Sequence, residues 1–398
     1  MTAYLDHAAT TPVLPEVIDI VAAAMRDVGN ASSLHTAGRS ARRIVEESRE
    51  SIADDLGARP SEVVFTSGGT ESDNMAIKGS LWRQTAKDPA RRRLLISAVE
   101  HHAVLDPVEH LVATGQAEVT WLMPDADGVI TPAVLAAALA DDPDSAALVS
   151  VMWANNEIGT IQPVAALAAA AHEAGVPLHT DAVQTLGQVP LDLTATGADM
   201  VTLTGHKVGG PLGVGVLVVG RDQDLVALTH GGGQERQLRS GTLDVPGVAG
   251  LAVAVRYAVA HQEAEARRLA VLRDALIDGA RALDRSITVS GFWERGDTTH
   301  RLAGNAHLRV PGCDGDSLLY LLDAVGVQCS TGSACQAGVP QPSHVLLAMG
   351  LSESDARGAL RLTLGHTSTD DDVQAFLHAL PTAVERARRA RHATDRAS

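Results

Sequence analysis

The residue best suited to covalent chemistry is Lys207. It follows a short apolar run at 200–204, lies beside His206 and precedes the glycine-rich stretch 209–215. A nucleotide-binding lysine is excluded, because the GxxxxGKS/T order is absent. Taken alone, such a lysine can be a solvated loop residue. If a tight site lowers the pKa of its amine, it can instead form a Schiff base with a carbonyl compound. Neighbouring segments must decide between these interpretations.

Asp181 is the first residue that favours the covalent role. It ends another strand-like run, in the segment His-Thr-Asp-Ala-Val-Gln, one β–α step before Lys207. The alternative is a helix cap, a common position for aspartate. A carboxylate there could instead keep a pyridine nitrogen protonated. The ring of pyridoxal phosphate (PLP) would then accept electrons from a substrate Cα.

Two more polar segments follow strand-like runs. One is a Phe-Thr-Ser-Gly-Gly-Thr turn, in which backbone N–H groups around Gly69 and the Thr70 hydroxyl could bind a phosphate. A plain turn capped by Thr70 is the alternative. The other contains His101 beside His102. Adjacent residues point to different faces and no third ligand stands nearby, so His101 stacked on a cofactor ring, or moving protons, is favoured over a metal site. The order glycine-Thr turn, His, Asp, Lys predicts PLP binding.

Cys335 is the candidate nucleophile among three cysteines, the others being Cys313 and Cys329. It ends the small, polar run Ser-Thr-Gly-Ser-Ala-Cys, which is typical of a loop. Most free cysteines are buried as small hydrophobic residues, and we expect this of Cys313 and Cys329. A loop thiolate could take sulfur at one site and carry it to another. The odd number and the lack of CxxC spacing indicate a reducing compartment and no zinc site.

The elements that must position these residues alternate between strand-like and helical patterns. Alanine-rich stretches of helical length, such as 133–140 and 164–174, separate the apolar runs. This alternation predicts an α/β fold with a mainly parallel sheet, in which ligands bind at the carboxyl ends of the strands. A long helix is predicted from 244–246 to about 283, followed by a smaller α+β unit over 286–380. The strand-like runs are 63–66, 94–98, 119–123, 148–153, 176–179, 200–204 and 215–219.

Composition limits the function classes. The 398 residues allow one large and one smaller domain, and 45% hydrophobic with 20% charged residues is ordinary for a globular protein. The net charge of -16 argues against direct binding to nucleic acid or anionic membranes. There is no apolar stretch of about 20 residues and no basic-then-apolar start, so we expect no membrane span, no signal peptide and a cytoplasmic location.

The matching motifs together resemble the cysteine desulfurases of the NifS/IscS type, which are class V aminotransferase-like, fold-type I PLP enzymes, and actinobacterial IscS-like members in particular. The resemblance implies a mainly parallel seven-stranded sheet between helices, with a smaller α+β C-terminal domain. It also implies a large PLP-binding domain at 13–255 and a small domain made of 1–12 and 256–398. The motifs lie at 4–12, 29–35, 66–74, 100–105, 154–160, 180–184, 204–210, 231–242, 331–335 and 360–365.

The resemblance implies a role for each matched residue. Lys207 would bond to PLP and later move the Cα proton. Asp181 would pair with the pyridinium nitrogen, His101 would stack on the ring, and Gln184 would hydrogen-bond the phenolic oxygen. The phosphate would be held by Gly69, Thr70, Thr204, His206 and, from the neighbouring subunit of a homodimer, Thr242.

The implied reaction removes sulfur from L-cysteine, giving L-alanine and a persulfide on Cys335. Asn155 and Arg361 would hold the substrate carboxylate, Arg361 through a bidentate pair. The sulfur would pass to an iron–sulfur scaffold protein or a tRNA-thiolating enzyme, and the site would need no metal. Another class V activity, such as an aminotransferase or selenocysteine lyase, is the first alternative. A non-catalytic PLP-binding protein is the second, and the presence of Lys207 argues against it.

The chain departs from the family pattern at three positions. His7 replaces the usual Asn, which could alter a contact near the substrate entrance. Thr204 replaces Ser and keeps the hydroxyl, so we expect little change. Gln336 stands where Thr is common and could affect the loop or partner docking.

Overall fold

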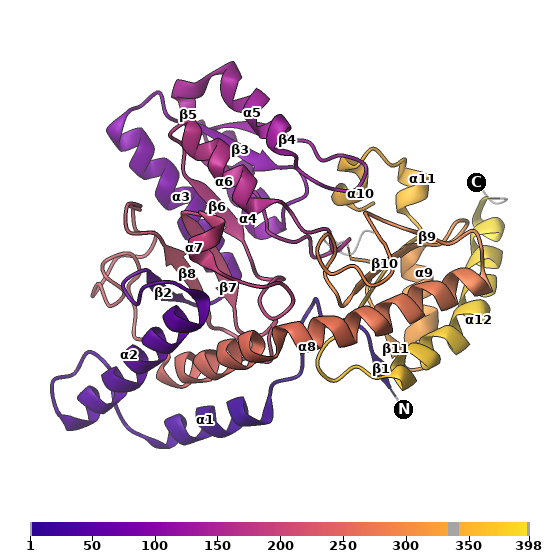
Figure 1. Ribbon diagram of the computed structural model, residues 1–398, viewed down its shortest axis with the longest axis horizontal. Coiled ribbons are helices and arrows are strands. Elements are labelled where there is room, and N and C mark those ends of the chain that lie inside the picture. Colours follow the sequence, from indigo (N-terminus) through magenta and orange to yellow (C-terminus); the bar gives the residue numbers. More distant parts are fainter. Residues whose placement is uncertain (1, 333–341, 396–398) are drawn as a thin grey trace.

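A seven-stranded sheet forms the centre of the larger part of the computed structural model, which describes residues 2–332 and 342–395 (Figure 1). Four neighbouring pairs are parallel, whereas β8 runs antiparallel to both of its neighbours, β2 and β7. The predicted fold class is therefore confirmed. In spatial order the strands are β2 (Val63–Thr66), β8 (Gly215–Val219), β7 (Met200–Thr204), β6 (Leu178–Asp181), β5 (Ala146–Ser150), β3 (Arg93–Ser97) and β4 (Glu118–Leu122).

Both faces of this sheet are covered, as the continuous apolar strands predicted. Successive residues of β3 alternate between two cores: Leu94 and Ile96 lie in one, and Leu95 lies in the other. The first core also contains residues of α3 (Gly69–Lys87) and α4 (His102–Ala113). The second is closed by α2 (Thr36–Leu56), α5 (Pro132–Asp141), α6 (Val164–Glu173), α7 (Leu193–Thr196) and the first half of α8 (Val245–Leu283).

The long helix α8 connects this part of the chain to a separate core (Figure 1). Its start is fixed by Asp244, whose carboxylate accepts a hydrogen bond from Gly247 N–H at 3.0 Å, and by Pro246 in the first turn. Helices α1 (Pro15–Arg26) and α2 pack against its first half. The helix predicted from 244–246 to about 283 is confirmed.

The second unit contains a small antiparallel sheet in the order β12 (Ala359–Thr363), β10 (Asn305–Arg309), β9 (Thr288–Val289). The N-terminal strand β1 (Ala3–Tyr4) pairs with β11 (Val327–Gln328), and Leu5 is fully buried in this core. The division into 13–255 and 1–12 with 256–398 stays a prediction, which the separate cores support. The remaining elements are the short helix η1 (Pro143–Ser145), α9 (Gly315–Asp323), α10 (His344–Ala348), α11 (Glu353–Ala356) and α12 (Asp370–Asp395).

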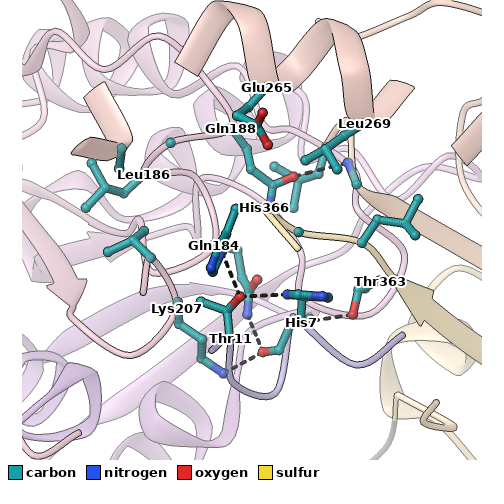
Figure 2. A pocket seen from close by; sticks show the side chains of 18 of the residues that line it. His7, Thr11, Gln184, Leu186, Gln188, Lys207, Glu265, Leu269, Thr363 and His366 are labelled. Carbon is teal, nitrogen blue, oxygen red and sulfur yellow. Dashed lines mark hydrogen bonds between the residues drawn. The ribbon is translucent and has the colours of Figure 1, made fainter. Parts of the chain in front are cut away.

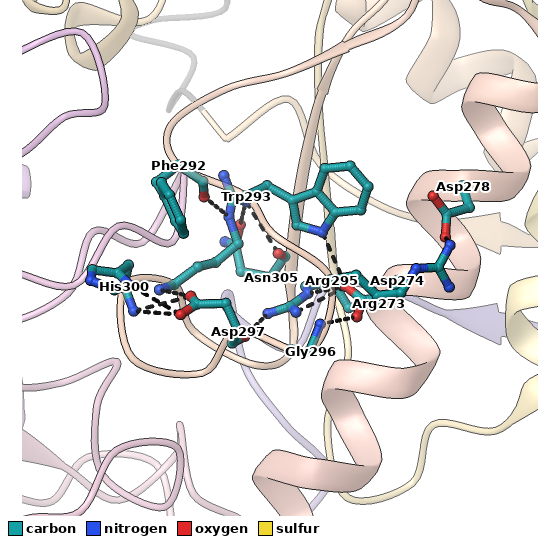
Figure 3. A network of polar contacts seen from close by, with 12 residues as sticks. Arg273, Asp274, Asp278, Phe292, Trp293, Arg295, Gly296, Asp297, His300 and Asn305 are labelled. Carbon is teal, nitrogen blue, oxygen red and sulfur yellow. Dashed lines mark hydrogen bonds and ion pairs between the residues drawn. The ribbon is translucent and has the colours of Figure 1, made fainter.

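A buried polar network ties α8 to the segment that precedes β10 (Figure 3). Asp274 on α8 accepts hydrogen bonds from Arg273, from Trp293 Nε1 at 3.0 Å and from Gly296 N–H at 2.6 Å. The fully buried Arg301 donates to the carbonyl oxygens of Phe292 and Ser290. Because buried charges need partners, the contacts of Asp274 and Arg301 hold the segment before β10 in place.

The segment so fixed supports a loop of the large unit. Leu302 N–H donates to the Gly159 carbonyl oxygen at 2.8 Å, and Asn305 Nδ2 donates to the Glu157 carbonyl oxygen at 2.9 Å.

No helix within 2–332 and 342–395 is long and apolar enough to cross a bilayer.

Candidate active site

A pocket of about 390 Å³ opens at the carboxyl ends of β6 and β7, where parallel α/β sheets bind ligands. It brings together most of the predicted site residues. These are Gly69, Thr70, His101, Asp181, Gln184, Thr204, His206, Lys207 and Arg361.

Lys207 lies on the loop after β7, with its amine directed at the N-terminal segment. Its Nζ donates to the carbonyl oxygens of Ala8 at 2.5 Å and Ala9 at 2.7 Å. Burial, followed by the positive charge of Arg361, lowers the pKa of Lys207 to about 8. A larger fraction of the amine is therefore uncharged near neutral pH, which is what nucleophilic attack on an aldehyde requires.

Asp181 is the last residue of β6 and is 5% exposed. Its Oδ1 accepts a hydrogen bond from Val183 N–H at 2.8 Å. Burial raises the pKa of Asp181 to about 6, although the Val183 bond and the charge of Lys207 act in the opposite direction. A cationic group bound beside Asp181 would therefore favour the ionised form of its carboxyl group.

Two side chains complete the walls beside Asp181 and Lys207. His101 caps α4 by accepting from Ala103 N–H through Nδ1 at 3.1 Å, and its ring lines the pocket. Burial, with the charge of Lys207, lowers the pKa of His101 to about 4, so the ring is neutral. Gln184 Nε2 donates to the Ala8 carbonyl oxygen at 3.0 Å, the same oxygen that Lys207 contacts.

The start of α3 lines the pocket through Gly69 and Thr70. Its N-cap is Gly68, which has φ of 145° and makes no side-chain cap, so the alternative of a turn capped by Thr70 is wrong. A Cβ on Gly69 would stand 3.0 Å from Val183 Cγ2, which leaves room for little more than a glycine. The first N–H groups of this 19-residue helix can bind an anion.

Thr204 and His206 lie beside this helix start. The Thr204 hydroxyl donates to the Val214 carbonyl oxygen at 3.3 Å. His206 Nδ1 is 3.3 Å from the Thr10 hydroxyl, and burial lowers the pKa of His206 to about 4. Both side chains line the pocket and can supply hydrogen bonds to a phosphate.

Arg361 approaches from β12 of the other unit and is 5% exposed. Its guanidinium donates to the Asn156 carbonyl oxygen at 3.1 Å and pairs with Asp6 at 2.7 Å. Its Nε is buried without a hydrogen-bond partner. Arg361 lines the pocket, so its guanidinium can pair with a carboxylate bound there.

Two predicted site residues, Asn155 and Thr242, are not brought to the pocket wall, and a third, Cys335, cannot be placed. Asn155 is fully buried behind it: its Oδ1 accepts from the N–H groups of Glu157 and Ile158, and its Nδ2 donates to the Val99 carbonyl oxygen. It therefore shapes the loop that carries Asn156, and the direct substrate contact expected of it stays a prediction. Thr242 is exposed on the loop before α8. Cys335 lies outside the described residues, but Ser330 and Gly332, just before it, line the pocket.

His7 lies beside the active-site pocket and does not line it. It lines a second, smaller cavity of about 80 Å³, which shares Lys207 and Gln184 with the active-site pocket (Figure 2). There His7 Nδ1 is 2.6 Å from the Thr11 hydroxyl, and burial lowers the pKa of His7 to about 4. The departure from the family pattern therefore lies in a cavity that adjoins the active-site pocket, and its effect near the substrate entrance stays a prediction.

Sequence reasoning missed Asp6, Asp73 and Asn156. Asp73 lies one turn after Gly69 on α3, so helical spacing within the quoted motif could have placed it on the same wall. The pairing of Asp6 with Arg361 joins residues at opposite ends of the chain, and no local signal reveals it. Within the described residues, no cluster of His, Cys, Asp or Glu could hold a metal ion.

The residues that line the pocket fit PLP. A lysine amine of lowered pKa, a buried carboxyl group and an uncapped helix start can hold its aldehyde, ring nitrogen and phosphate, respectively. The fold and pocket therefore define an α/β enzyme that holds a phosphorylated carbonyl cofactor.

Comparison with known proteins identifies the family. The chain matches the aminotransferase class-V family over residues 3–376 and belongs to it. It is 57% identical over 388 residues to the IscS-like cysteine desulfurase of Mycobacterium tuberculosis, covering 98% of each chain. It is 41% identical to the cysteine desulfurase IscS of Methanosarcina thermophila, covering 97% of this chain and 92% of that protein. The predicted resemblance to NifS/IscS-type proteins is confirmed.

Solved structures agree with this assignment. A NifS-like protein superposes with a TM-score of 0.87 at 33% identity, over 97% of this chain and 99% of that one. A structure described as SspA in complex with cysteine superposes with a TM-score of 0.76 at 34% identity, over 91% of this chain and 99% of that one.

Proposed function

We propose that this chain is a PLP-dependent cysteine desulfurase that converts L-cysteine to L-alanine and holds the sulfur as a persulfide on Cys335. The observation that carries the proposal is one pocket joining Lys207, Asp181 and Arg361, with Gly332 from the segment before Cys335 on its wall. The related proteins named cysteine desulfurases span nearly the whole chain and support the same reaction.

PLP, when bound, withdraws electrons from the Cα of an amino acid attached to it. Lys207 would bind the cofactor through its amine and could hold or return the Cα proton at Nζ. Asp181 would stabilise the protonated ring nitrogen. His101 would pack against the cofactor, and the helix start with Thr70, Thr204 and His206 would hold the phosphate.

Sulfur transfer needs no external oxidant or reductant. The Cβ–S bond of cysteine breaks, a new S–S bond forms with the Cys335 sulfur, and the remaining carbon skeleton gains a proton to become alanine. Cysteine plus the Cys335 thiol thus yields alanine plus the Cys335 persulfide, with atoms and electrons balanced. The thiolate form is the attacking species.

Arg361 should anchor the substrate carboxylate, because it is a buried arginine that lines the pocket. We expect Arg361→Lys to raise the KM for cysteine by about tenfold to a hundredfold with a smaller effect on kcat, since a point charge cannot replace the planar fork. Steady-state alanine release measures both constants. Arg309→Lys, on the adjacent strand β10 and outside the pocket, is the matched control. An unchanged KM for Arg361→Lys would contradict the assignment.

The proposal includes a homodimer. Large apolar side chains are exposed around α1 and the segment that follows it, including Val28 at 87% and Leu34 at 88%. Contiguous exposed apolar surface is typical of an interface. Thr242, which does not line the pocket of its own chain, is exposed and could reach the phosphate site of a second copy.

The acceptor and the location are also proposals. An iron–sulfur scaffold protein or a tRNA-thiolating enzyme would take the sulfur. A cytoplasmic location agrees with the free thiols of Cys313 and Cys329.

One incubation tests the function. The purified holoenzyme given L-cysteine should release alanine, and mass spectrometry should find one added sulfur atom on the protein. An aminotransferase, the leading alternative, would instead need an amino acceptor and leave no sulfur on the chain. Alanine release without any protein-bound sulfur would overturn the proposal.

A further inference from the structure

Asp73, Glu100 and Asp181 are buried carboxyl groups at the active-site pocket, and the reaction described above uses only Asp181: Asp73 and Asp181 line the pocket, and Glu100 directly precedes the lining residue His101. Asp73 comes from α3 and Glu100 from the turn after β3; each is 1% exposed. Within the described residues, Asp73 Oδ1 and Glu100 Oε2 have no hydrogen-bond partner. Asp73 lines the same pocket as Asp181. These unused acids need an explanation, because a buried carboxylate that no cation balances is costly.

Strand alternation places the groups that face Asp73. His179 and Asp181 lie two residues apart on β6 and so point to the same face, on which α3 packs. Thr202 of β7 stands opposite Asp181 in the register of the sheet. Its hydroxyl lies 3.0 Å from His179 Nε2, and the other ring nitrogen, Nδ1, is 2.9 Å from the Ser150 hydroxyl.

No cation balances Asp73. His179 Nε2 is 3.5 Å from Asp73 Oδ1, but complete burial lowers the pKa of His179 to about 3, so the ring is neutral. Lys207 is the cation that lowers the pKa of Asp181. Within 2–332 and 342–395, the only ion-pair contact of Asp73 is the one with His179, and Glu100 has none.

Burial and the neighbouring charge of Asp181 raise the pKa of Asp73 well above its ordinary value, and a hydrogen bond with Thr202 offsets only part of this. The pKa of Glu100 is raised for the same two reasons, with Met152 N–H opposing. Charging all three groups would place several anions around one lysine in a site of low dielectric constant.

We propose that Asp73 is a positioning residue that keeps its proton in the folded holoenzyme, so that Asp181 is the single ionised carboxylate beside the cofactor ring. A protonated Asp73 places a polar side chain near Asp181 without adding a second negative charge. One carboxylate then balances one protonated ring nitrogen. This inference rests on the proposed function only for the identity of the group that Asp181 faces.

The pH dependence of stability gives a test in which the two possibilities predict different slopes. An acid whose pKa is raised by folding costs stability progressively as pH rises from its unfolded value of about 3.9 towards its folded value. Asp73→Asn keeps the shape and removes this cost. We expect the melting temperature of the Asp73→Asn holoenzyme, minus that of the wild type, to rise by about 2 °C or more between about pH 5 and about pH 9.

An Asp73 that is already ionised, with a folded pKa at or below the unfolded value of about 3.9, predicts a flat difference over this pH range, because its contribution to stability is complete before pH 5. If asparagine merely fits less well than aspartic acid, the difference in melting temperature shifts by the same amount at every pH and its slope is unchanged. A falling or flat difference therefore overturns the proposal. The absorbance of bound PLP, recorded on the same samples, shows that occupancy is equal.

Infrared spectroscopy supplies a second measurement that does not depend on stability. The wild-type holoenzyme at neutral pH should show a carbonyl band of a protonated carboxylic acid, which is lost in Asp73→Asn, or in Asp73→Ser should the first variant fold poorly. Loss of a carboxylate band instead would overturn the proposal. Neither measurement uses turnover, so the result is independent of whether cysteine is the substrate.

Asp199→Asn is the matched control. This aspartate, just before β7, accepts hydrogen bonds from Leu178 N–H at 2.7 Å and Gln223 Nε2 at 2.8 Å, and pairs with His172 at 2.8 Å. Its replacement should lower the melting temperature and should leave the protonated-acid band in place.

Discussion

Replacing Lys207 by alanine is expected to abolish the absorbance band of bound PLP and to lower the rate of alanine release from cysteine by about ten-thousandfold. Lys207 is the pocket amine whose pKa burial lowers to about 8, and its Nζ already lies among acceptors at the pocket wall. Its loss removes both the bond to the cofactor and the group that moves the Cα proton. Absorbance spectra and an alanine assay measure the two effects separately.

The small number of lysines makes the attachment site easy to establish. The sequence contains only Lys78, Lys87 and Lys207, so borohydride reduction of the holoenzyme followed by peptide mapping has three possible outcomes. We expect the cofactor on Lys207 alone. Lys87→Ala, at the exposed end of α3, should keep the band and the rate. A Lys207→Ala protein that retains the band would disprove the assignment.

The parts of the site predicted from sequence are those that local patterns encode. Asp181 ends one apolar strand and Lys207 follows the neighbouring one, and parallel strands bring such positions to one edge of a sheet. The predicted strand at 176–179 lies two residues early, since β6 spans Leu178–Asp181 and contains Asp181 itself. Burial of the whole strand removes the alternation that would mark its end.

Contacts between distant segments were not predictable in the same way. The pairing of β1 with β11 carries Asp6 to Arg361, and it depends on how the two ends of the chain fold together. Asn155 was assigned to substrate from its motif, whereas its amide is fully engaged in holding the loop around Asn156. A motif identifies which residue types are needed at a site, but only the surrounding structure distinguishes a contact with substrate from support of the loop.

Replacing Cys335 by alanine is expected to lower alanine release from cysteine by about a hundredfold or more and to remove the added sulfur atom, while the PLP band stays unchanged. The reason is chemical: without the Cys335 thiolate, nothing accepts the substrate sulfur when the Cβ–S bond breaks. Persulfide mapping by mass spectrometry and the alanine assay give the two readouts.

The other cysteines provide the controls for this variant. Burial, with the charges of Asp6 and Asp323, raises the pKa of Cys329 to about 12, and Cys313 is fully buried. Neither thiol is easily ionised, so Cys329→Ala and Cys313→Ala should keep both the added sulfur and the rate. Normal turnover in Cys335→Ala would separate this chain from desulfurases and favour a class V activity that needs only the cofactor pocket. Loss of sulfur transfer with the band intact would instead assign cofactor chemistry to the pocket and sulfur acceptance to Cys335.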